Sequence, residues 1–160
     1  MSTAINIHGT AIIVGTTGLL FVGPSGSGKS ALAFACLASA RMRGLFAALV
    51  SDDQVFVSQQ GSHLLAERAR TIAGLIELRG SGLVATDSHP AALLHYAILP
   101  VDLARAPRLP PEDERFELFE GALLPLVRLA SQAPDPFAML DAIIDFSADS
   151  DRDDGLKTVF

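Results

Sequence analysis

The chain has few of the features that mark secreted, membrane-bound or nucleic-acid-binding proteins. Cys36 is the one cysteine among its 160 residues, so no disulfide can form within the chain, which is typical of a reducing compartment. No basic stretch followed by an apolar one stands at the N-terminus, and no apolar run approaches the roughly 18 residues of a membrane span. The net charge of −6 provides no basic stripe for a nucleic acid. These absences predict a cytoplasmic protein that has neither a nucleic-acid nor a membrane partner.

The composition is that of a folded protein with a sizeable core. Hydrophobic residues make up 49% of the chain and charged residues 19%, and the length predicts one domain. We expect this domain over residues 1–146 and a flexible acidic tail over residues 147–160, which contain four aspartates and few apolar side chains. Cys36 falls within a predicted helix and is expected to be a small buried apolar residue.

The stretch from Gly23 to Ser30 is a complete G-x-x-x-x-G-K-[ST] phosphate-binding loop. Glycines let the backbone turn tightly and present N–H groups to phosphate oxygens. Lys29 can reach the terminal phosphates as a point charge, and Ser30 can give its hydroxyl to a magnesium ion. An apolar strand over residues 19–22 and an Ala- and Leu-rich helix over residues 30–43 supply the flanks that the motif requires. The predicted nucleotide-binding residues are Gly23, Pro24, Ser25, Gly26, Ser27, Gly28, Lys29 and Ser30.

Two adjacent carboxylates, Asp52 and Asp53, follow a second apolar strand predicted over residues 45–50. Ligands of open α/β sheets gather at the carboxyl ends of strands. We therefore expect at least one of the two to hold magnesium or to act as a base toward an incoming nucleophile. The alternative for either residue is that it caps a turn.

A second unusual stretch, residues 73–84, places Glu77 and Arg79 two residues apart in a predicted extended run, and so on one face. Gly80 and Gly82 follow and allow close backbone approach. At a phosphate site, a carboxylate and a guanidinium could together bind magnesium and phosphate. The alternative is an exposed cross-strand ion pair, which would not need the glycines.

The rest of the pattern is rich in short strands. Two or three are expected within residues 4–22, and His8 lies at the end of the first, where its residue type alone favours a structural role. Further expectations are a turn over 15–18, a hairpin over 54–65 with a polar turn at 58–61, a solvated connector over 67–70, strands over 93–101, 116–119 and 123–127, an exposed proline-rich loop over 106–114, and a helix from Asp135 to about Phe146.

Four of these stretches together resemble the catalytic domain of HPr kinase/phosphorylase, in the short form that lacks a separate N-terminal domain. They are the His8-Gly9-Thr10 segment, the phosphate loop, the strand that ends in paired aspartates, and the run from Ile76 to Leu83. The last is similar to the Glu-x-Arg-Gly-x-Gly signature of the family and is the most discriminating. The resemblance covers residues 8 to about 84 well and the remainder loosely.

The resemblance implies an α/β fold with a mixed sheet, related to phosphoenolpyruvate carboxykinase. It implies a serine kinase that uses ATP and magnesium to phosphorylate the phosphocarrier protein HPr, and so regulates the phosphotransferase system and carbohydrate metabolism. Family members also remove that phosphate by phosphorolysis, and full-length members are hexamers.

The resemblance also implies roles for individual residues. Asp53 would take the serine proton, and the same group would act as an acid in the reverse reaction. Ser30 and Glu77 would hold magnesium, while Lys29 and His8 would contact phosphates. Arg108, followed by leucine in the proline-rich loop, fits a loop arginine of the family. Asp52, Arg79 and Gly80 would occupy the remaining positions of the family's signature and phosphate site.

The chain departs from the family pattern after its last predicted strands. Residues 129–135 lack the arginines of a family loop linked to dephosphorylation and subunit contacts, which puts phosphorolysis and hexamer formation in doubt. Two other functions remain open. A small-molecule kinase would need an arginine-rich lid, whereas a nucleotide-sensing switch would need Lys29 and Ser30 but not Asp53.

Overall fold

Strand β9 (Ala91–Val101) is the centre of the large sheet. The computed structural model describes residues 3–146, so the acidic tail expected over residues 147–160 lies outside the described residues. Within that range a nine-stranded sheet has the order β1-β5-β6-β9-β3-β2-β4, with β11 added to β9 and β10 to β11. Strand β9 pairs in parallel with β3 and β11 and antiparallel with β6. The sheet is therefore mixed, as expected.

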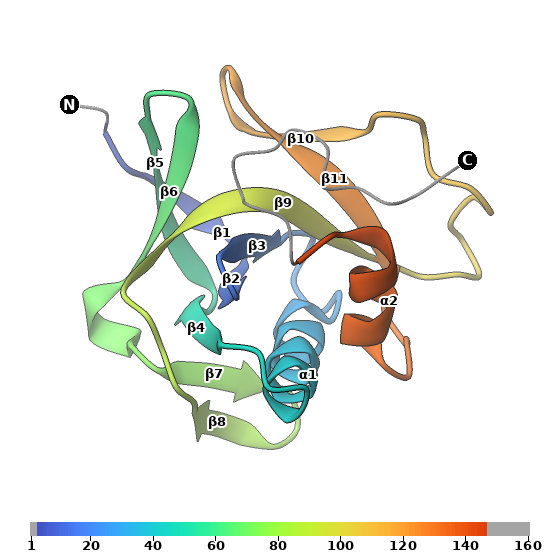
Figure 1. Cartoon of the computed structure of the whole chain (residues 1–160), viewed down its shortest axis with the longest axis horizontal. Helices are drawn as coiled ribbons and strands as arrows, with labels where there is room; N and C mark the ends of the chain where they lie inside the picture. Colours follow the sequence, from blue (N-terminus) through green and yellow to red (C-terminus); the bar gives the residue numbers. More distant parts are fainter. Residues whose placement is uncertain (1–2, 147–160) are drawn as a thin grey trace.

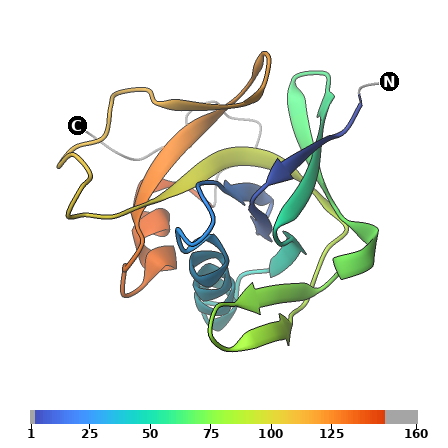
Figure 2. The ribbon, with the colours of Figure 1, turned by 180° about the vertical axis from the view of Figure 1, so that it is seen from behind.

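The helices lie together on one side of this sheet (Figures 1 and 2), next to a separate two-stranded sheet made by β7 and β8. Within the described residues neither helix is long and apolar enough to cross a membrane. The bounds of the elements are β1 Ile5–His8, β2 Thr10–Val14, β3 Thr17–Phe21, α1 Lys29–Met42, β4 Ala47–Ser51, β5 Gln54–Gln60, β6 His63–Arg68, the 3₁₀ turn η1 Arg70–Ile72, β7 Leu75–Leu78, β8 Gly82–Ala85, β9 Ala91–Val101, β10 Arg115–Phe119, β11 Ala122–Ala130 and α2 Pro136–Ile143.

The large sheet contains a two-stranded ribbon that bends sharply in the middle. Strands β1 and β2 form one side of this ribbon, and their partners β5 and β4 form the other. Strands β1 and β2 are separated by Gly9 alone, and their partners β5 and β4 are separated by Asp52 and Asp53. A Cβ on Gly9 would lie 2.7 Å from the carbonyl oxygen of Phe21, closer than two non-bonded atoms can approach, so the bend requires glycine. The paired aspartates thus lie at the corner of the ribbon.

Alternating side chains of β2 and β3 enter two apolar layers. Ile12 and Leu19 face α1, where they meet Cys36 and Leu37. Their neighbours Ala11 and Leu20 belong to the other layer. All five residues of β3 are buried, and burial of each large apolar side chain contributes roughly 1.5–3 kcal/mol. The strand that leads into the phosphate loop is therefore held firmly on both faces.

Several boundaries differ from the sequence expectation. Helix α2 ends at Ile143 instead of about Phe146, because Ile144 turns extended and buries its side chain completely. The connector expected over residues 67–70 is wrong for its first half, since β6 continues to Arg68 and pairs with both β5 and β9. The polar turn expected at 58–61 is shorter, because β5 runs to Gln60. Of the turn expected over 15–18, the last two residues belong to β3.

Candidate active site

The phosphate loop connects the end of β3 to the start of α1. Val22 N–H donates to the carbonyl of Ile98, which fixes the entry to the loop beside β9. Gly23, Gly26 and Gly28 all have positive φ, at 127°, 80° and 99°, a region that side-chain-bearing residues rarely adopt. No described side chain caps α1, and its first turn has no acidic residue. The partial positive charge of this 14-residue helix is therefore open to an anion.

Lys29 points back into its own loop. Its Nζ donates to the carbonyl oxygens of Gly23 and Pro24, both at 2.9 Å, and the residue is 7% exposed. Burial lowers the pKa of Lys29 below its ordinary value, Asp53 and Asp52 oppose this shift, and Arg79 adds to it. The carboxylates and the guanidinium are thus close enough to act on the lysine.

The carboxylate of Asp52 is hydrogen-bonded to three elements, β2, α1 and β7. Its Oδ1 accepts hydrogen bonds from Thr10 Oγ1 at 2.8 Å and Ser30 Oγ at 2.7 Å, and its Oδ2 accepts from the backbone N–H of Glu77 at 2.9 Å. Asp52 is 5% exposed. Hydrogen bonds to a charged group contribute about 1.5–3 kcal/mol each before coupling, so this carboxylate fixes Ser30 and the signature strand β7 relative to the ribbon corner.

The side chain of Asp53, unlike that of Asp52, is exposed to solvent. Its side chain is 66% exposed, and its Oδ1 lies 3.1 Å from Nδ1 of His8, which is 53% exposed. Its carbonyl oxygen accepts a hydrogen bond from Gly9 N–H at 3.1 Å. The φ of Asp53 is 69°, and such a conformation costs of order 1–3 kcal/mol for a residue with a side chain. The ribbon corner therefore holds a strained carboxylate toward solvent beside an imidazole.

Arg79 lies against the phosphate loop. A Cβ on Gly26 would be 3.0 Å from its Nη1, so the guanidinium covers the middle of the loop. The extended run expected over 73–84 is a hairpin, in which β7 ends at Leu78 and Arg79 belongs to the turn. Glu77 and Arg79 therefore do not share one strand face, and the expected pairing of the two side chains is wrong in this respect. The Glu77 side chain is exposed, and Gly80 lies in the turn with a φ of 85°.

Arg108 is not joined to this group by any contact within the described chain. It is exposed in the loop between β9 and β10. The loop begins at the same end of β9 that lies beside the phosphate loop, because Phe21 pairs with Ile98. The two loops therefore leave the same edge of the sheet, but no hydrogen bond or ion pair among residues 3–146 brings Arg108 to the phosphate loop.

One residue of the site, Thr10, was not predicted from the sequence, and the predicted loop residue Ser27 has an environment that the sequence did not indicate. Thr10 is fully buried and anchors Asp52; a polar residue at the start of an apolar strand is the signal that could have pointed to it. Ser27 Oγ is buried, lies 3.1 Å from the position of a Cβ on Gly23, and has no hydrogen-bond partner among the described residues. A buried hydroxyl without a partner inside a glycine-rich loop fits a site built to receive hydrogen-bonding groups of a ligand.

The oxygen atoms near Ser30 fit magnesium. Ser30 Oγ and the Asp52 carboxylate lie side by side, and Glu77 is tied to the same carboxylate through its backbone. Hydroxyl and carboxylate oxygens suit this hard cation. Within residues 3–146 no group of three or more His, Cys, Asp or Glu residues forms a complete metal cage. A magnesium ion here would take its other ligands from phosphates and water, which is the usual manner for this ion.

These features define a class: a mixed-sheet α/β protein in which a glycine-rich loop, a helix N-terminus and two carboxylates meet at one corner. The family model described as the HPr Serine kinase C-terminal domain matches residues 1–89. The chain belongs to this family, as its motifs led us to expect.

Two relatives put this membership in context. The chain is 36% identical over 80 residues to the HPr kinase/phosphorylase of Mycoplasmopsis pulmonis (strain UAB CTIP). That match covers 50% of this chain and 24% of the relative, so the similarity spans about a quarter of the relative's length. The structure of the Hpr(Ser) kinase/phosphatase from Coxiella burnetii superposes with a TM-score of 0.69 at 20% identity, over 86% of this chain and 92% of the other. This likeness confirms the expected fold.

Proposed function

We propose that this chain is a cytoplasmic serine kinase that transfers the γ-phosphate of ATP to the phosphocarrier protein HPr, in the presence of magnesium, and thereby regulates the phosphotransferase system. The support is the family membership, together with the names of the two relatives, which describe HPr kinases. One geometric observation carries the proposal. From the phosphate loop outward, Ser30, Asp52, Asp53 and His8 follow one another through contacts of 2.7–3.1 Å or by adjacency in the chain.

The residues of the chain divide the work between donor and acceptor. Loop amides and the N-terminus of α1 bind the phosphates of ATP, while Lys29 exchanges the carbonyls of Gly23 and Pro24 for phosphate oxygens. Arg79 covers the loop and offsets the negative charge there. Ser30, with Asp52 and Glu77, would hold magnesium, which when bound neutralises charge on the phosphate oxygens.

On the acceptor side, Asp53 takes the proton of the incoming serine hydroxyl. The serine oxygen bonds to the γ-phosphorus while the bond from that phosphorus to the bridging oxygen of ADP breaks. His8 holds the carboxylate of Asp53 and reaches toward the transferred phosphate. Positioning and charge neutralisation supply most of the rate, as in other phosphoryl transfers. Arg108, in the loop that leaves the same edge of the sheet as the phosphate loop, contacts the transferred phosphate in this proposal.

The forward reaction is the principal activity in this proposal. The loop between β11 and α2, residues 131–135, has no arginine, so we propose that phosphorolysis is weak and that subunit assembly, a hexamer by resemblance, depends on other contacts.

The test is transfer of labelled phosphate from ATP to a serine of HPr by the purified chain with magnesium. We expect Asp53→Asn to abolish transfer while ATP still binds. Asp113→Asn is the matched control, because Asp113 is the other described non-glycine residue with positive φ, at 50°, and lies exposed in the loop before β10. Transfer at the normal rate by Asp53→Asn would contradict the assignment. Label on a small metabolite would instead indicate a small-molecule kinase, and tight ATP binding without any transfer would indicate a nucleotide-sensing switch.

A further inference from the structure

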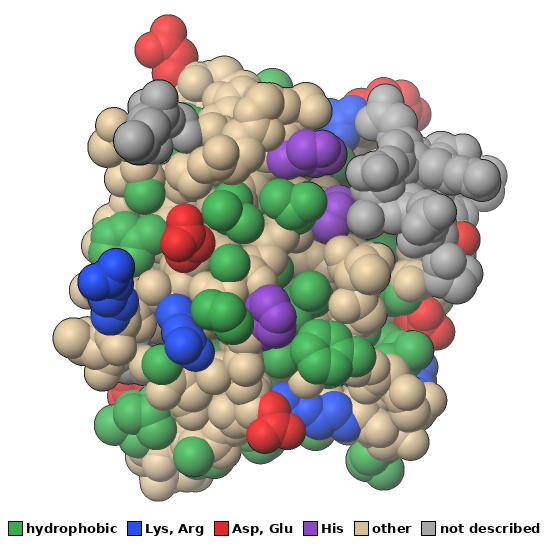
Figure 3. All heavy atoms as spheres, turned by 60° about the vertical axis from the view of Figure 1, so that its left-hand side comes forward, with side chains coloured by type: hydrophobic (Ala, Val, Ile, Leu, Met, Phe, Trp, Pro, Cys, Tyr) green, Lys and Arg blue, Asp and Glu red, His purple; other side chains and the backbone are tan. Residues whose placement is uncertain are grey.

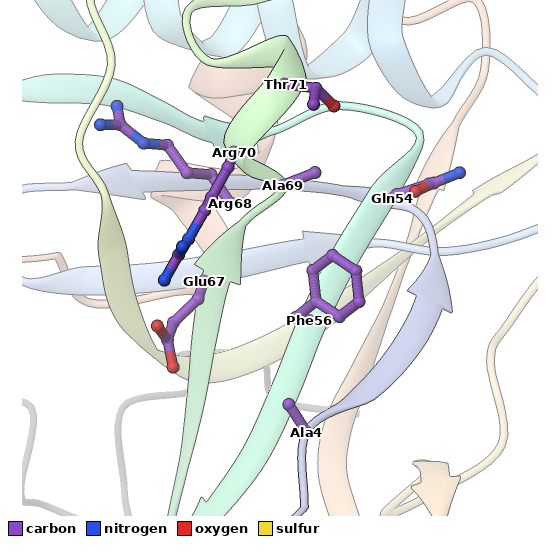
Figure 4. Close-up of a pocket in the computed structure, with 8 residues that line it drawn as sticks. All are labelled: Ala4, Gln54, Phe56, Glu67, Arg68, Ala69, Arg70 and Thr71. Atoms are coloured by element: carbon purple, nitrogen blue, oxygen red, sulfur yellow. The ribbon is translucent and has the colours of Figure 1, made fainter.

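A groove of about 470 Å³ runs along the outer side of the sheet next to the ribbon corner. Its lining consists of Ala4, of Gln54 and Phe56 of β5, and of the segment from Glu67 to Thr71 (Figure 4). We propose that this groove docks the polypeptide segment of the acceptor protein that carries the phosphorylated serine. This inference rests on the proposed kinase function and names the surface that such a function requires.

The position of the groove carries the first step. Gln54 follows Asp53 directly in the chain and is paired with His8 across the ribbon. Phe56 is the next outward position of β5, about 6.6 Å along the strand. The nucleotide loop lies on the other side of Asp52, at Ser30. Asp52 thus contacts the nucleotide loop, whereas Asp53 precedes the first β5 residue of the groove, and in this proposal the serine reaches Asp53 from the groove.

Phe56 supplies the apolar part of the groove. It lies three positions from Asp53, about 10 Å along an extended strand, because a strand advances about 3.3 Å per residue. Its side chain is half-buried on the outward face of β5. Residues further from the serine would pass between β5 and the η1 turn. An apolar side chain near the acceptor serine is therefore the first chemical requirement on the partner.

The charges of the groove give the second requirement. Arg70 is exposed and has no hydrogen bond or ion pair within residues 3–146, whereas the guanidinium of Arg68 donates to Ser88 Oγ at 3.3 Å. In Figure 4 Arg70 and Glu67 extend in the same direction. A single carboxylate of a partner can pair with Arg70, but the Glu67 carboxylate beside it disfavours a multiply charged anion. A polypeptide with one acidic residue suits the groove better than a free polyphosphate.

The surrounding surface agrees with a protein partner. The face that comes forward when the left-hand side of Figure 1 is turned toward the viewer has acidic and basic side chains separated by apolar and neutral ones (Figure 3). No patch of a single sign dominates this view. Aromatic and arginine side chains such as Phe56 and Arg70 are enriched at protein interfaces.

The experiment is steady-state transfer from ATP to HPr by wild type, Phe56→Ala and Arg70→Glu. We expect each variant to raise KM for HPr at least tenfold, while KM for ATP and kcat at saturating HPr stay within about twofold. That tenfold rise corresponds to about 1.4 kcal/mol, which is within the range that truncation of one good interface residue costs. Arg115→Glu is the matched control for charge reversal, since Arg115 is exposed in β10, outside the groove, and has no ion pair among the described residues.

Each result decides the question. If wild type transfers phosphate to HPr and both variants keep its KM for HPr, the groove does not dock the acceptor although the kinase function stands. A fall in kcat without a change in KM for HPr would also overturn the proposal, because it indicates a disturbed site. If wild type does not phosphorylate HPr at all, the proposed function fails and this inference fails with it. Arg70→Glu keeps the test informative should Phe56→Ala fold poorly, because Arg70 is exposed and contributes no packing.

Discussion

The hydroxyl of Ser30 donates a hydrogen bond of 2.7 Å to Asp52 Oδ1 across 22 positions of the chain. This contact links the first turn of α1 to the ribbon corner, and the same carboxylate also binds Thr10 and the backbone of Glu77. The neighbouring carboxylate of Asp53 has none of these partners and faces solvent beside His8. The two adjacent aspartates therefore have different environments, since Asp52 is buried and hydrogen-bonded whereas Asp53 is exposed.

This division predicts that Asp52→Asn destabilises the protein and Asp53→Asn does not. In wild type both carboxylate oxygens of Asp52 accept hydrogen bonds. Asparagine replaces one of these oxygens by an NH₂ group, which cannot accept, so at least one buried donor loses its partner. We expect a loss of about 2–4 kcal/mol in the free energy of unfolding, since each lost partner of a buried charged group costs about 1–3 kcal/mol. Asp53→Asn should change it by less than about 0.5 kcal/mol, as exposed substitutions usually do, and asparagine tolerates positive φ. Urea unfolding measures both, and equal midpoints for the two variants would contradict the assignment.

Lys29 predicts a pH dependence with a definite sign. Burial lowers its pKa in the folded, nucleotide-free protein. Between that lowered pKa and about 10.5, the unfolded chain therefore holds more protons at this position than the folded one. Unfolding free energy then rises with pH. The stability of wild type relative to Lys29→Met should accordingly increase as the pH approaches 10.5.

Urea unfolding of both proteins from pH 7.5 to 10.5, without nucleotide, measures this difference. The thiol of Cys36 titrates in this range in the unfolded chain, because burial raises its pKa to about 12 in the folded protein. Its contribution is the same in both proteins and cancels. A difference in stability that stays constant or falls with pH would show that the lysine is not desolvated inside its loop. Lys29→Met should also weaken ATP binding at least tenfold, because it removes a charged partner of the phosphates.

Cys36 predicts an unreactive thiol. It is fully buried between α1 and the sheet, and burial raises its pKa from 9.0 to about 12. A shift of three pKa units lowers the thiolate fraction near pH 8 about a thousandfold. We expect iodoacetamide to modify the folded protein at least a hundredfold more slowly than the urea-unfolded chain. Equal rates in the two states would mean that the helix leaves the sheet readily.

The local motifs were predictable, because neighbouring residues determine them. The phosphate loop depends on glycines at fixed spacing, and the flanking strand and helix follow from the apolar pattern around it. The roles of Asp52 and Asp53 could not be told apart in this way. What buries one and exposes the other is Thr10 and Glu77, which join Asp52 from distant parts of the chain.

The misassigned pair Glu77 and Arg79 has a similar cause. Alternation placed both on one strand face, but β7 stops at Leu78 and the turn sends Arg79 toward Gly26. Strand ends depend on which turn the glycines adopt, and a pattern of period two does not contain that information. The parallel pairing of β9 with both β3 and β11 is likewise set by packing of the whole sheet. The loop with Arg108 has no periodic pattern from which its path could be read.

Strand β1 has β5 as its one hydrogen-bonded neighbour in the described sheet, while β3 is paired on both edges and buried on both faces. The two halves of the site therefore belong to cooperative units of unequal stability. Local opening of β1 would carry His8 away from Asp53 and leave Lys29, Ser30 and Asp52 in place. Hydrogen exchange should thus begin at β1 well before it reaches β3. In the proposed kinase, such opening would remove the ability to activate an acceptor and leave nucleotide binding intact, at a free-energy cost far below that of unfolding the chain.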